Sequence, residues 1–197
     1  MNTPNKLTIF RIILTLIIVV ILLFPFSAMG IDIAQIFVNE TIVIDVRYLV
    51  AGVLFIIASL TDFIDGYIAR KYNLVTDFGK MIDAISDKLL TNSVLIILAC
   101  NGKISTIVAV VIVMRDIVVD SIKMVIGNQG AAVAAIGLAK VKTATLMVGI
   151  ILTLFSNLPF ELISLRISDF LLAIAAVLSI ISAAKYYIMA KPYLQNK

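Results

Sequence analysis

Four aspartates lie in an apolar part of the chain at spacings that suit metal chemistry. Asp62 and Asp65 are three residues apart. Asp83 and Asp87 are four residues apart. In a helix, either spacing places both carboxylates on one face, about one turn from each other. Carboxylates at bilayer depth cost several kcal/mol unless they are paired with something charged. Two such faces brought together would form an oxygen-rich site for hard divalent cations.

Two glycines and an arginine accompany these aspartates. Gly66 follows Asp62 by one helical turn, and Gly79 precedes Asp83 by one turn. A missing side chain at such a place lets another backbone or a bulky ligand approach closely. Arg70 offers a planar fork of donors that suits phosphate oxygens. Together these residue types favour a nucleotide diphosphate held by metal ions.

The composition is that of an integral membrane protein. Of 197 residues, 62% are hydrophobic and only 14% are charged, with a mean hydropathy of +1.14. Soluble domains are nearer half apolar and a quarter charged. The single cysteine, Cys100, excludes a disulfide framework and a cysteine-based metal site, and the absence of histidine excludes imidazole chemistry. Any general base must then be a carboxylate, lysine or tyrosine.

Six apolar runs long enough to cross a bilayer predict six transmembrane helices. The runs lie near 7–29, 47–70, 78–100, 104–127, 140–158 and 167–189. The expected fold class is an all-α integral membrane protein made of one domain, 1–197. A short turn after the second run would make runs two and three antiparallel, so that the two aspartate pairs face each other in a polar, metal-binding cavity. The first run could be read as a signal peptide, but its flanks favour a retained span.

The basic residues predict the orientation, because lysine and arginine collect on the cytoplasmic side. With the N-terminus in the cytoplasm, twelve basic residues lie inside: Lys6, Arg11, Arg70, Lys71, Lys80, Lys88, Lys123, Lys140, Lys142, Lys185, Lys191 and Lys197. Three lie outside: Arg47, Lys103 and Arg166. All four motif aspartates are then at the cytoplasmic end. The basic residues do not form an aromatic-interleaved patch, so no nucleic-acid partner is expected.

The pattern D-x2-D-G-x2-A-R-x8-G-x3-D-x3-D, from Asp62 to Asp87, resembles the signature of the CDP-alcohol phosphotransferase family at every fixed position. The resemblance implies two divalent ions, Mg²⁺ or Mn²⁺. Their ligands would be Asp62, Asp65, Asp83 and Asp87. The CDP moiety would be held by Gly66, Ala69, Arg70 and Gly79. Asp87 would also take the proton from the attacking hydroxyl group, and the protein would be a homodimer.

Three further stretches resemble the bacterial members of this family that use glycerol 3-phosphate. They are Pro4–Arg11, Asp83–Leu89 and Ala139–Thr143. The resemblance implies transfer of the phosphatidyl group from CDP-diacylglycerol to sn-glycerol 3-phosphate, at the cytoplasmic face of a bacterial plasma membrane. The acceptor phosphate would need cations, and the candidates are Arg115, Lys123, Lys140 and Lys142.

Alternatives remain for these cations and for the function. Arg115 could instead pair with Asp116 or Asp120, and the two lysines of the fifth run could be ordinary cytoplasmic anchors. Ala84 and Ala139 stand where those relatives usually have proline and glycine. Inositol phosphate, serine or phosphatidylglycerol therefore remain alternative acceptors. A divalent-cation transporter is an alternative of another class, but it would distribute its acids along a path across the membrane.

Overall fold

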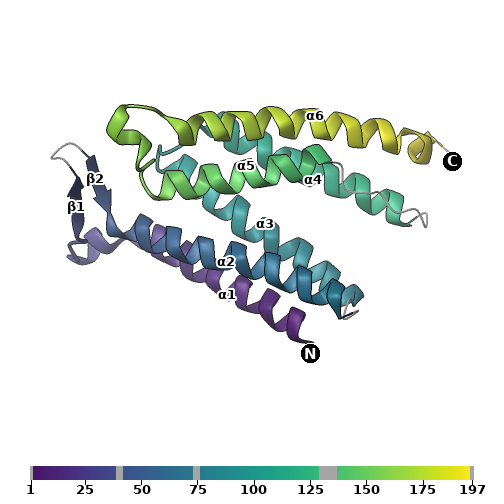
Figure 1. The fold of residues 1–197 in the computed structure, drawn as a ribbon, viewed down its shortest axis with the longest axis horizontal. Coiled ribbons are helices and arrows are strands. Elements are labelled where there is room, and N and C mark those ends of the chain that lie inside the picture. The colour runs from purple at the N-terminus through teal and green to yellow at the C-terminus, as the bar shows by residue number, and fades with distance from the viewer. Residues whose placement is uncertain (1, 39–41, 73–75, 129–136, 196–197) are drawn as a thin grey trace.

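Six long α-helices form the body of the protein in the computed structural model, which describes residues 2–38, 42–72, 76–128 and 137–195 (Figure 1). The helices are α1 (Thr3–Leu23), α2 (Val46–Lys71), α3 (Asp77–Cys100), α4 (Thr106–Asn128), α5 (Gly137–Leu154) and α6 (Ile167–Gln195). They run alternately up and down the long axis of the molecule. The expected all-α architecture is confirmed for this body.

Four of these helices contain segments long and apolar enough to cross a membrane. The segments are Pro4–Leu23, Val46–Ala69, Gly137–Leu154 and Ile167–Tyr193. Both α3 and α4 carry several charged residues along their length, so composition alone does not identify them as spans. A membrane protein is therefore confirmed, whereas the number of six spans stays a prediction.

A small β-hairpin, which the sequence analysis did not predict, lies between α1 and α2. Strand β1 (Gln35–Val38) pairs antiparallel with β2 (Ile42–Asp45), and Gln35 lies opposite Asp45. The β-branched run at the start of β2 suits an extended strand. The first helix also ends at Leu23, several residues before the predicted end of the first span, because Pro25 follows shortly after it.

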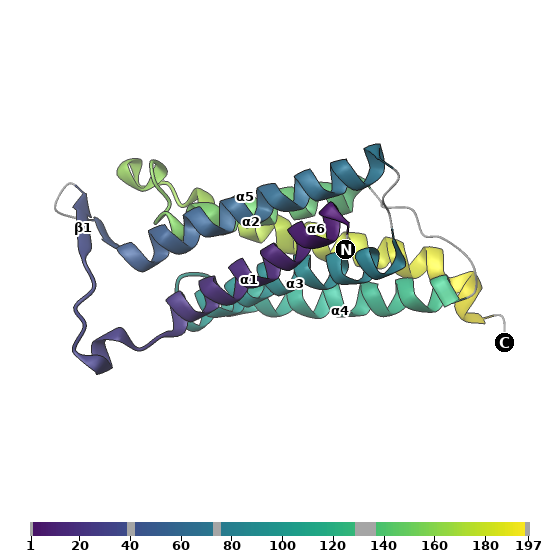
Figure 2. The same ribbon diagram turned by 90° about the horizontal axis from the view of Figure 1, so that it is seen from below.

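Short 3₁₀ turns extend the connections at the hairpin end of the molecule. They are η1 (Phe26–Met29), before the hairpin, and η2 (Phe160–Ile163), between α5 and α6. Helix α5 stops at Leu154, earlier than the predicted 158, and the chain then turns through left-handed Ser156 and Asn157. Figures 1 and 2 show the start of α1 and the C-terminal end of α6 on the side of the bundle away from the hairpin.

Helix α1 packs against both α2 and α3, whereas α2 and α3 contact each other far less. Helices α2 and α3 are antiparallel, as the sequence predicts, but α1 mediates much of their association (Figure 2). In the rest of the bundle, α6 packs against both α4 and α5. Contacts of α3 with α4, and of α2 with α5, join these two parts.

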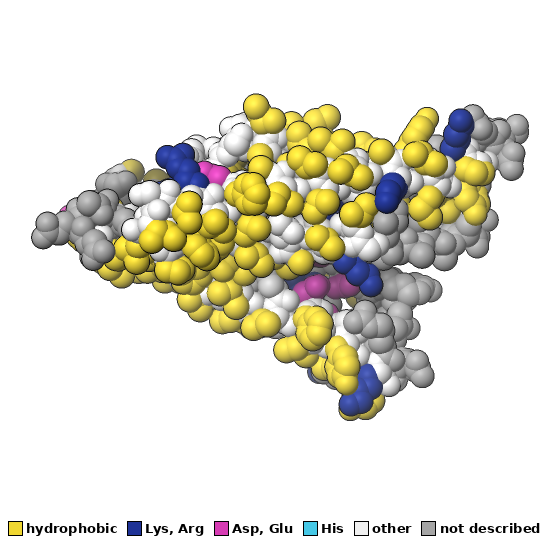
Figure 3. Space-filling model, turned by 45° about the horizontal axis from the view of Figure 1, so that its top comes forward, with side chains coloured by type: hydrophobic (Ala, Val, Ile, Leu, Met, Phe, Trp, Pro, Cys, Tyr) yellow, Lys and Arg dark blue, Asp and Glu magenta, His cyan; other side chains and the backbone are white. Residues whose placement is uncertain are grey.

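The apolar core connects the helices away from the charged end. Its fully buried members include Ile18, Phe55, Leu98 and Ile150, from four different helices. Large apolar side chains also cover the outer surface (Figure 3). Such an apolar exterior is expected where lipid tails replace water.

Close packing of α5 against α6 depends on Gly149, which is buried. A Cβ atom at this position would lie 2.9 Å from both Cγ and Cδ2 of Leu172, which is itself buried. We expect Gly149→Ala to destabilise the protein, because overpacking costs about 1–3 kcal/mol. That cost exceeds the helix-propensity gain of up to about 1 kcal/mol. Thermal unfolding in detergent, followed by circular dichroism, measures the change.

Gly127→Ala is the matched control, since a Cβ atom there meets nothing within 4 Å. It should leave the unfolding temperature unchanged or slightly higher. Equal unfolding temperatures for the two variants would contradict the packing role of Gly149.

Candidate active site

Three of the four motif aspartates converge at one place in the structure. Asp62 and Asp65 come from α2, and Asp83 comes from α3. One carboxylate oxygen of each lies within 4.8 Å of those of the other two. Their side chains differ in exposure, from 3% for Asp65 to 34% for Asp62 and 50% for Asp83. This acidic triad is therefore anchored in the protein interior and open on one side. Figure 3 shows acidic side chains in a hollow of the surface, beside basic ones.

A buried arginine on α1 joins the three carboxylates. Nη1 of Arg11 lies 2.6 Å from Oδ1 of Asp62 and 3.1 Å from Oδ1 of Asp83. Its Nη2 forms an ion pair with Asp65. The Arg11 side chain has no exposed surface. Thr8, one turn earlier, donates a hydrogen bond of 3.3 Å from Oγ1 to Oδ2 of Asp65. The two acidic faces therefore meet around α1.

This role of Arg11 was not predicted from the sequence, in which Arg11 was assigned to the cytoplasmic cations and to the Pro4–Arg11 stretch. A detectable signal was present in the polar residues Asn5, Thr8, Arg11 and Thr15, which recur every three or four positions in a mainly apolar helix. That spacing places them on one helix face. All four are buried, so this polar stripe faces the protein and not the lipid.

Asp87 lies one turn beyond Asp83 on α3 and outside the triad of close oxygens. Its electrostatic neighbours include Asp62, Arg11 and Asp83. Oδ1 of Asp87 and Oδ1 of Asp65 are both buried, and neither has a hydrogen-bond partner among the described residues. Buried polar atoms without partners are uncommon, so these two oxygens have unused acceptor capacity.

The donor set fits a hard divalent cation. All the acidic side chains in this group offer oxygen atoms, which Mg²⁺ and Mn²⁺ prefer over softer donors. The two carboxylate oxygens without partners supply acceptor capacity that the described residues do not use. The residues present therefore suit the metal that the family resemblance implies.

Residues expected to hold the CDP moiety lie on the two helix ends beside the triad. Gly79 is in the first turn of α3, where its N–H donates to Oγ1 of the N-cap Thr76 at 3.0 Å. A Cβ atom at Gly79 would lie 2.7 Å from Oδ1 of Asn5. Its missing side chain therefore admits the start of α1, a reason that the sequence did not reveal. Gly66 and Ala69 lie partly buried on α2, and the side chain of Arg70 lies outside the described part.

A second ionic cluster joins α4, α5 and α6. Nζ of Lys142, a buried lysine on α5, donates to Asp116 Oδ1 at 2.9 Å and Oδ2 at 3.2 Å. Arg115 donates to Oδ1 of Asp116 at 2.9 Å and to Oγ of Ser182 at 2.7 Å. The pairing of Arg115 with Asp116 corresponds to the structural alternative raised from the sequence. Asp116 thus bridges two of the four cations proposed for the acceptor phosphate.

The other cations around this cluster leave it with excess positive charge. Nζ of Lys123 lies 5.0 Å from the ring centroid of Tyr186, and Cζ of Arg115 lies 5.9 Å from the same centroid. Lys88 on α3 forms an ion pair with Asp120. The cluster thus combines four cations, Lys88, Arg115, Lys123 and Lys142, with two carboxylates, Asp116 and Asp120. Lys140, the remaining candidate, is exposed on the first turn of α5.

The acidic triad and this cationic cluster are neighbours through α3. Lys88 directly follows Asp87, and its electrostatic neighbours include Asp116 and Lys142. Asp116 is likewise among the electrostatic neighbours of Asp87. An anionic group held by the cations would therefore lie within electrostatic range of the acidic site.

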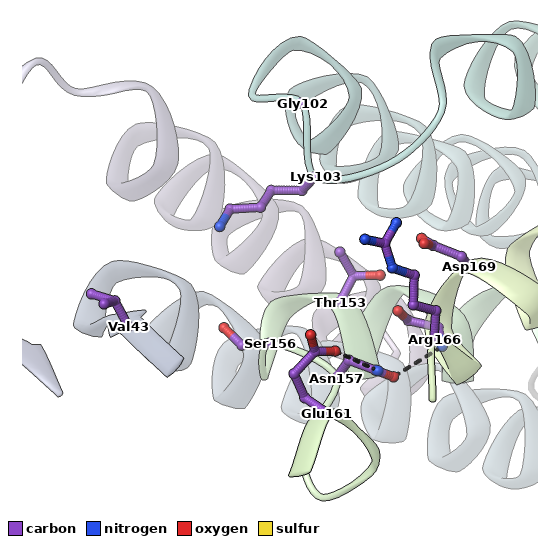
Figure 4. A pocket seen from close by; sticks show the side chains of 10 residues that line it. Val43, Gly102, Lys103, Thr153, Ser156, Asn157, Glu161, Arg166 and Asp169 are labelled. Atoms are coloured by element: carbon purple, nitrogen blue, oxygen red, sulfur yellow. Dashed lines mark hydrogen bonds between the residues drawn. The ribbon is translucent and has the colours of Figure 1, made fainter. Parts of the chain in front are cut away.

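A separate polar pocket lies at the hairpin end of the molecule (Figure 4). Its volume is about 360 Å³, and its lining includes Lys103, Arg166 and Asp169. Asn157 organises the adjoining turn, since its Nδ2 donates to Glu161 Oε2 at 2.9 Å and to the carbonyl of Leu165 at 2.6 Å. None of the residues predicted from the sequence motifs lines this pocket.

Comparisons with known proteins bear on the whole chain. A family model described as CDP-alcohol phosphatidyltransferase matches residues 1–181. The chain is 39% identical to the CDP-diacylglycerol--glycerol-3-phosphate 3-phosphatidyltransferase of Bacillus subtilis (strain 168), over 94% of this chain and 93% of that protein. It is 36% identical to the protein of the same name from Rickettsia bellii (strain RML369-C), over 98% and 97% of the two chains. The corresponding protein of Rickettsia typhi (strain ATCC VR-144 / Wilmington) is 38% identical, over 98% of each chain.

The bridge between Lys142 and Asp116 should stabilise the fold. Both side chains are buried, so removing Asp116 leaves Lys142 without its counter-ion, whereas removing Lys142 leaves Asp116 still paired with Arg115. We expect Asp116→Asn to lower the free energy of unfolding by about 3 kcal/mol, and Lys142→Gln to lower it by less. Lys140→Gln, at an exposed site on the same helix as Lys142, should change it by less than about 0.5 kcal/mol. Thermal or denaturant unfolding in detergent tests this, and equal stability of all three variants would contradict it.

Proposed function

Because the chain belongs to the CDP-alcohol phosphatidyltransferase family, we propose that it transfers the phosphatidyl group from CDP-diacylglycerol to sn-glycerol 3-phosphate. The products are phosphatidylglycerophosphate and CMP. The names of the relatives support this assignment, since those proteins align with nearly the full length of the chain. The observation that carries it is the convergence of Asp62, Asp65 and Asp83 at one end of the bundle.

The metal ions of this reaction are Mg²⁺ or Mn²⁺, held by the acidic triad with Asp87 beside it. Bound there, they would neutralise the diphosphate of the lipid donor and stabilise the departing CMP. Asp65 is suited to be the innermost ligand, because it is the most buried of the three. Gly66, Ala69, Arg70 and Gly79 hold the CDP moiety.

The chain's own residues supply the proton transfer. The acceptor hydroxyl oxygen forms a bond to the phosphorus that carries the lipid, and the bond from that phosphorus to the CMP oxygen breaks. Asp87 takes the hydroxyl proton. Its Oδ1 is buried without a hydrogen-bond partner among the described residues, so it has a free lone pair for this role.

The acceptor is a phosphorylated alcohol held by Arg115, Lys123, Lys140 and Lys142. The excess of cations over carboxylates in the second cluster supports this choice. Serine and phosphatidylglycerol, the alternative acceptors, offer no phosphate dianion to balance that excess. Asp116 holds Arg115 and Lys142 together, which places two donors side by side for phosphate oxygens.

In the membrane, all six helices span the bilayer, with the acidic triad at the cytoplasmic side of the plasma membrane. The charge asymmetry of the sequence supports this orientation. The exposed apolar surface of the bundle supports its immersion in lipid. As the family resemblance implies, the working form is a homodimer.

The reaction is tested with the purified protein in detergent and CDP-diacylglycerol as donor. CMP release should require sn-glycerol 3-phosphate and should be absent with glycerol, serine, inositol phosphate or phosphatidylglycerol. It should stop with EDTA and return with excess Mg²⁺ or Mn²⁺, since oxygen ligands favour these ions. CMP release with glycerol at the same rate would refute a phosphate-reading acceptor site. Cation flux into proteoliposomes without CMP release would favour a transporter.

Asp87 can be separated from the metal ligands by comparing binding with turnover. Asp62→Asn and Asp83→Asn should abolish both turnover and metal-dependent binding of the CDP-lipid. Asp87→Asn should lower turnover by about 10²-fold or more, because it removes the base, while CDP-lipid binding persists. Binding is measured by equilibrium dialysis with labelled donor. Equal loss of binding in all three variants would instead make Asp87 chiefly a ligand.

A further inference from the structure

We propose that Arg11 is a built-in counter-ion that balances the acidic triad when no metal is bound and thereby limits the affinity of the free enzyme for divalent ions. The inference rests on the metal site of the proposed function and extends it to a residue outside the aspartate motif. Arg11 would set the net charge of the site before substrate binds.

Arg11 contacts the whole acidic triad. One guanidinium group contacts all three carboxylates of the acidic triad, at 2.6 Å for Asp62 and 3.1 Å for Asp83, with Asp65 as the third partner. Planar guanidinium groups suit several carboxylates at once, and they remain protonated at any relevant pH. The triad alone carries three negative charges, and Arg11 reduces the net charge to minus two. One divalent ion would neutralise Arg11 and the triad together, while Asp87 beside them adds a further negative charge.

Arg11 is fully buried beside the apolar core. Its side chain has no exposed surface, and the next turns of α1 place Leu14 and Ile18 in the apolar core. The guanidinium group is therefore held among the carboxylates, and a metal ion that binds them lies beside it. The metal ion and Arg11 must therefore share the same carboxylates, and their mutual repulsion is poorly screened at a buried site.

The charge of Arg11 would also couple the binding of metal to the binding of the lipid donor. Arg11 lowers the affinity of the empty site for a metal ion. That affinity rises when a further anionic group enters, and the diphosphate of the lipid donor is such a group. Arg11 would then face the substrate oxygens as well as the carboxylates, so its charge would favour the loaded site while opposing metal binding to the empty one. Metal and donor would bind cooperatively.

Direct binding of Mn²⁺ to the detergent-solubilised protein tests this without any substrate. The free ion gives an electron paramagnetic resonance signal, so titration yields the dissociation constant. Arg11→Gln should bind Mn²⁺ about tenfold or more tightly than the unmodified protein, because one nearby positive charge is removed. Arg11→Lys, which keeps the charge, should stay close to the unmodified protein. Lys6→Gln is the matched control, since it removes an exposed cation from the same helix. It should leave the affinity unchanged.

Unfolding temperatures give a second readout. Without metal, Arg11→Gln should unfold at a lower temperature than the unmodified protein, and saturating Mn²⁺ should raise its unfolding temperature by more. Where Arg11→Gln alone does not yield folded protein, the double variant Arg11→Gln/Asp83→Asn restores the net charge of the triad. It should recover folded, metal-free protein.

Unchanged or weaker Mn²⁺ binding by Arg11→Gln would overturn the proposal, since a residue that only positions the carboxylates would weaken binding when lost. A double variant no more stable than Arg11→Gln alone would also overturn it. The proposed function fails separately, through absence of CMP release by the unmodified protein.

Discussion

The cost of placing carboxylates in an apolar surrounding governs how this protein is assembled. Asp65 is almost fully buried and Arg11 fully so, and each offsets the cost of burying the other's charge. Pairing Arg11 with Asp65 on α2 and with Asp83 on α3 requires α1 to lie against both helices, which is the arrangement observed. The N-terminal helix is therefore part of the site and more than a membrane anchor. Gly79 completes the fit, because its missing side chain leaves room for Asn5 at the start of α1.

The same principle recurs in the other part of the bundle with opposite charge. Asp116 is buried between Lys142 and Arg115, and these contacts tie α4 to α5 and, through Ser182, to α6. Here cations exceed carboxylates, whereas around Arg11 carboxylates exceed cations. Two neighbouring regions of opposite net charge suit a reaction that joins a metal-bound diphosphate to a phosphorylated alcohol. The described residues balance only part of the charge in each region. The acidic region can therefore bind a cation, and the basic region can bind an anion.

The sequence predicted much of this architecture, because hydrophobic runs and motif spacing are local properties. The bounds of α2, α3 and α4 lie within a few residues of the predicted runs, and three of the four motif aspartates converge. The role of Arg11 was not predicted, since its partners lie more than fifty positions away and no local pattern names them. The β-hairpin was missed because it occupies a short connection between strongly apolar runs. The alternatives for Arg115 could not be separated from sequence, since one helix can offer an arginine both a neighbouring aspartate and partners on α6.

Helix α3 is shared by both charged regions, and adjacent residues on it serve different ones. Asp87 neighbours the acidic triad electrostatically, while Lys88 pairs with Asp120 on α4. Consecutive side chains on a helix point about 100° apart, so the two residues face different halves of the bundle from a single turn. A rotation of α3 about its axis would therefore move a group of each region together. At this helix the two charged regions therefore cannot shift independently of each other.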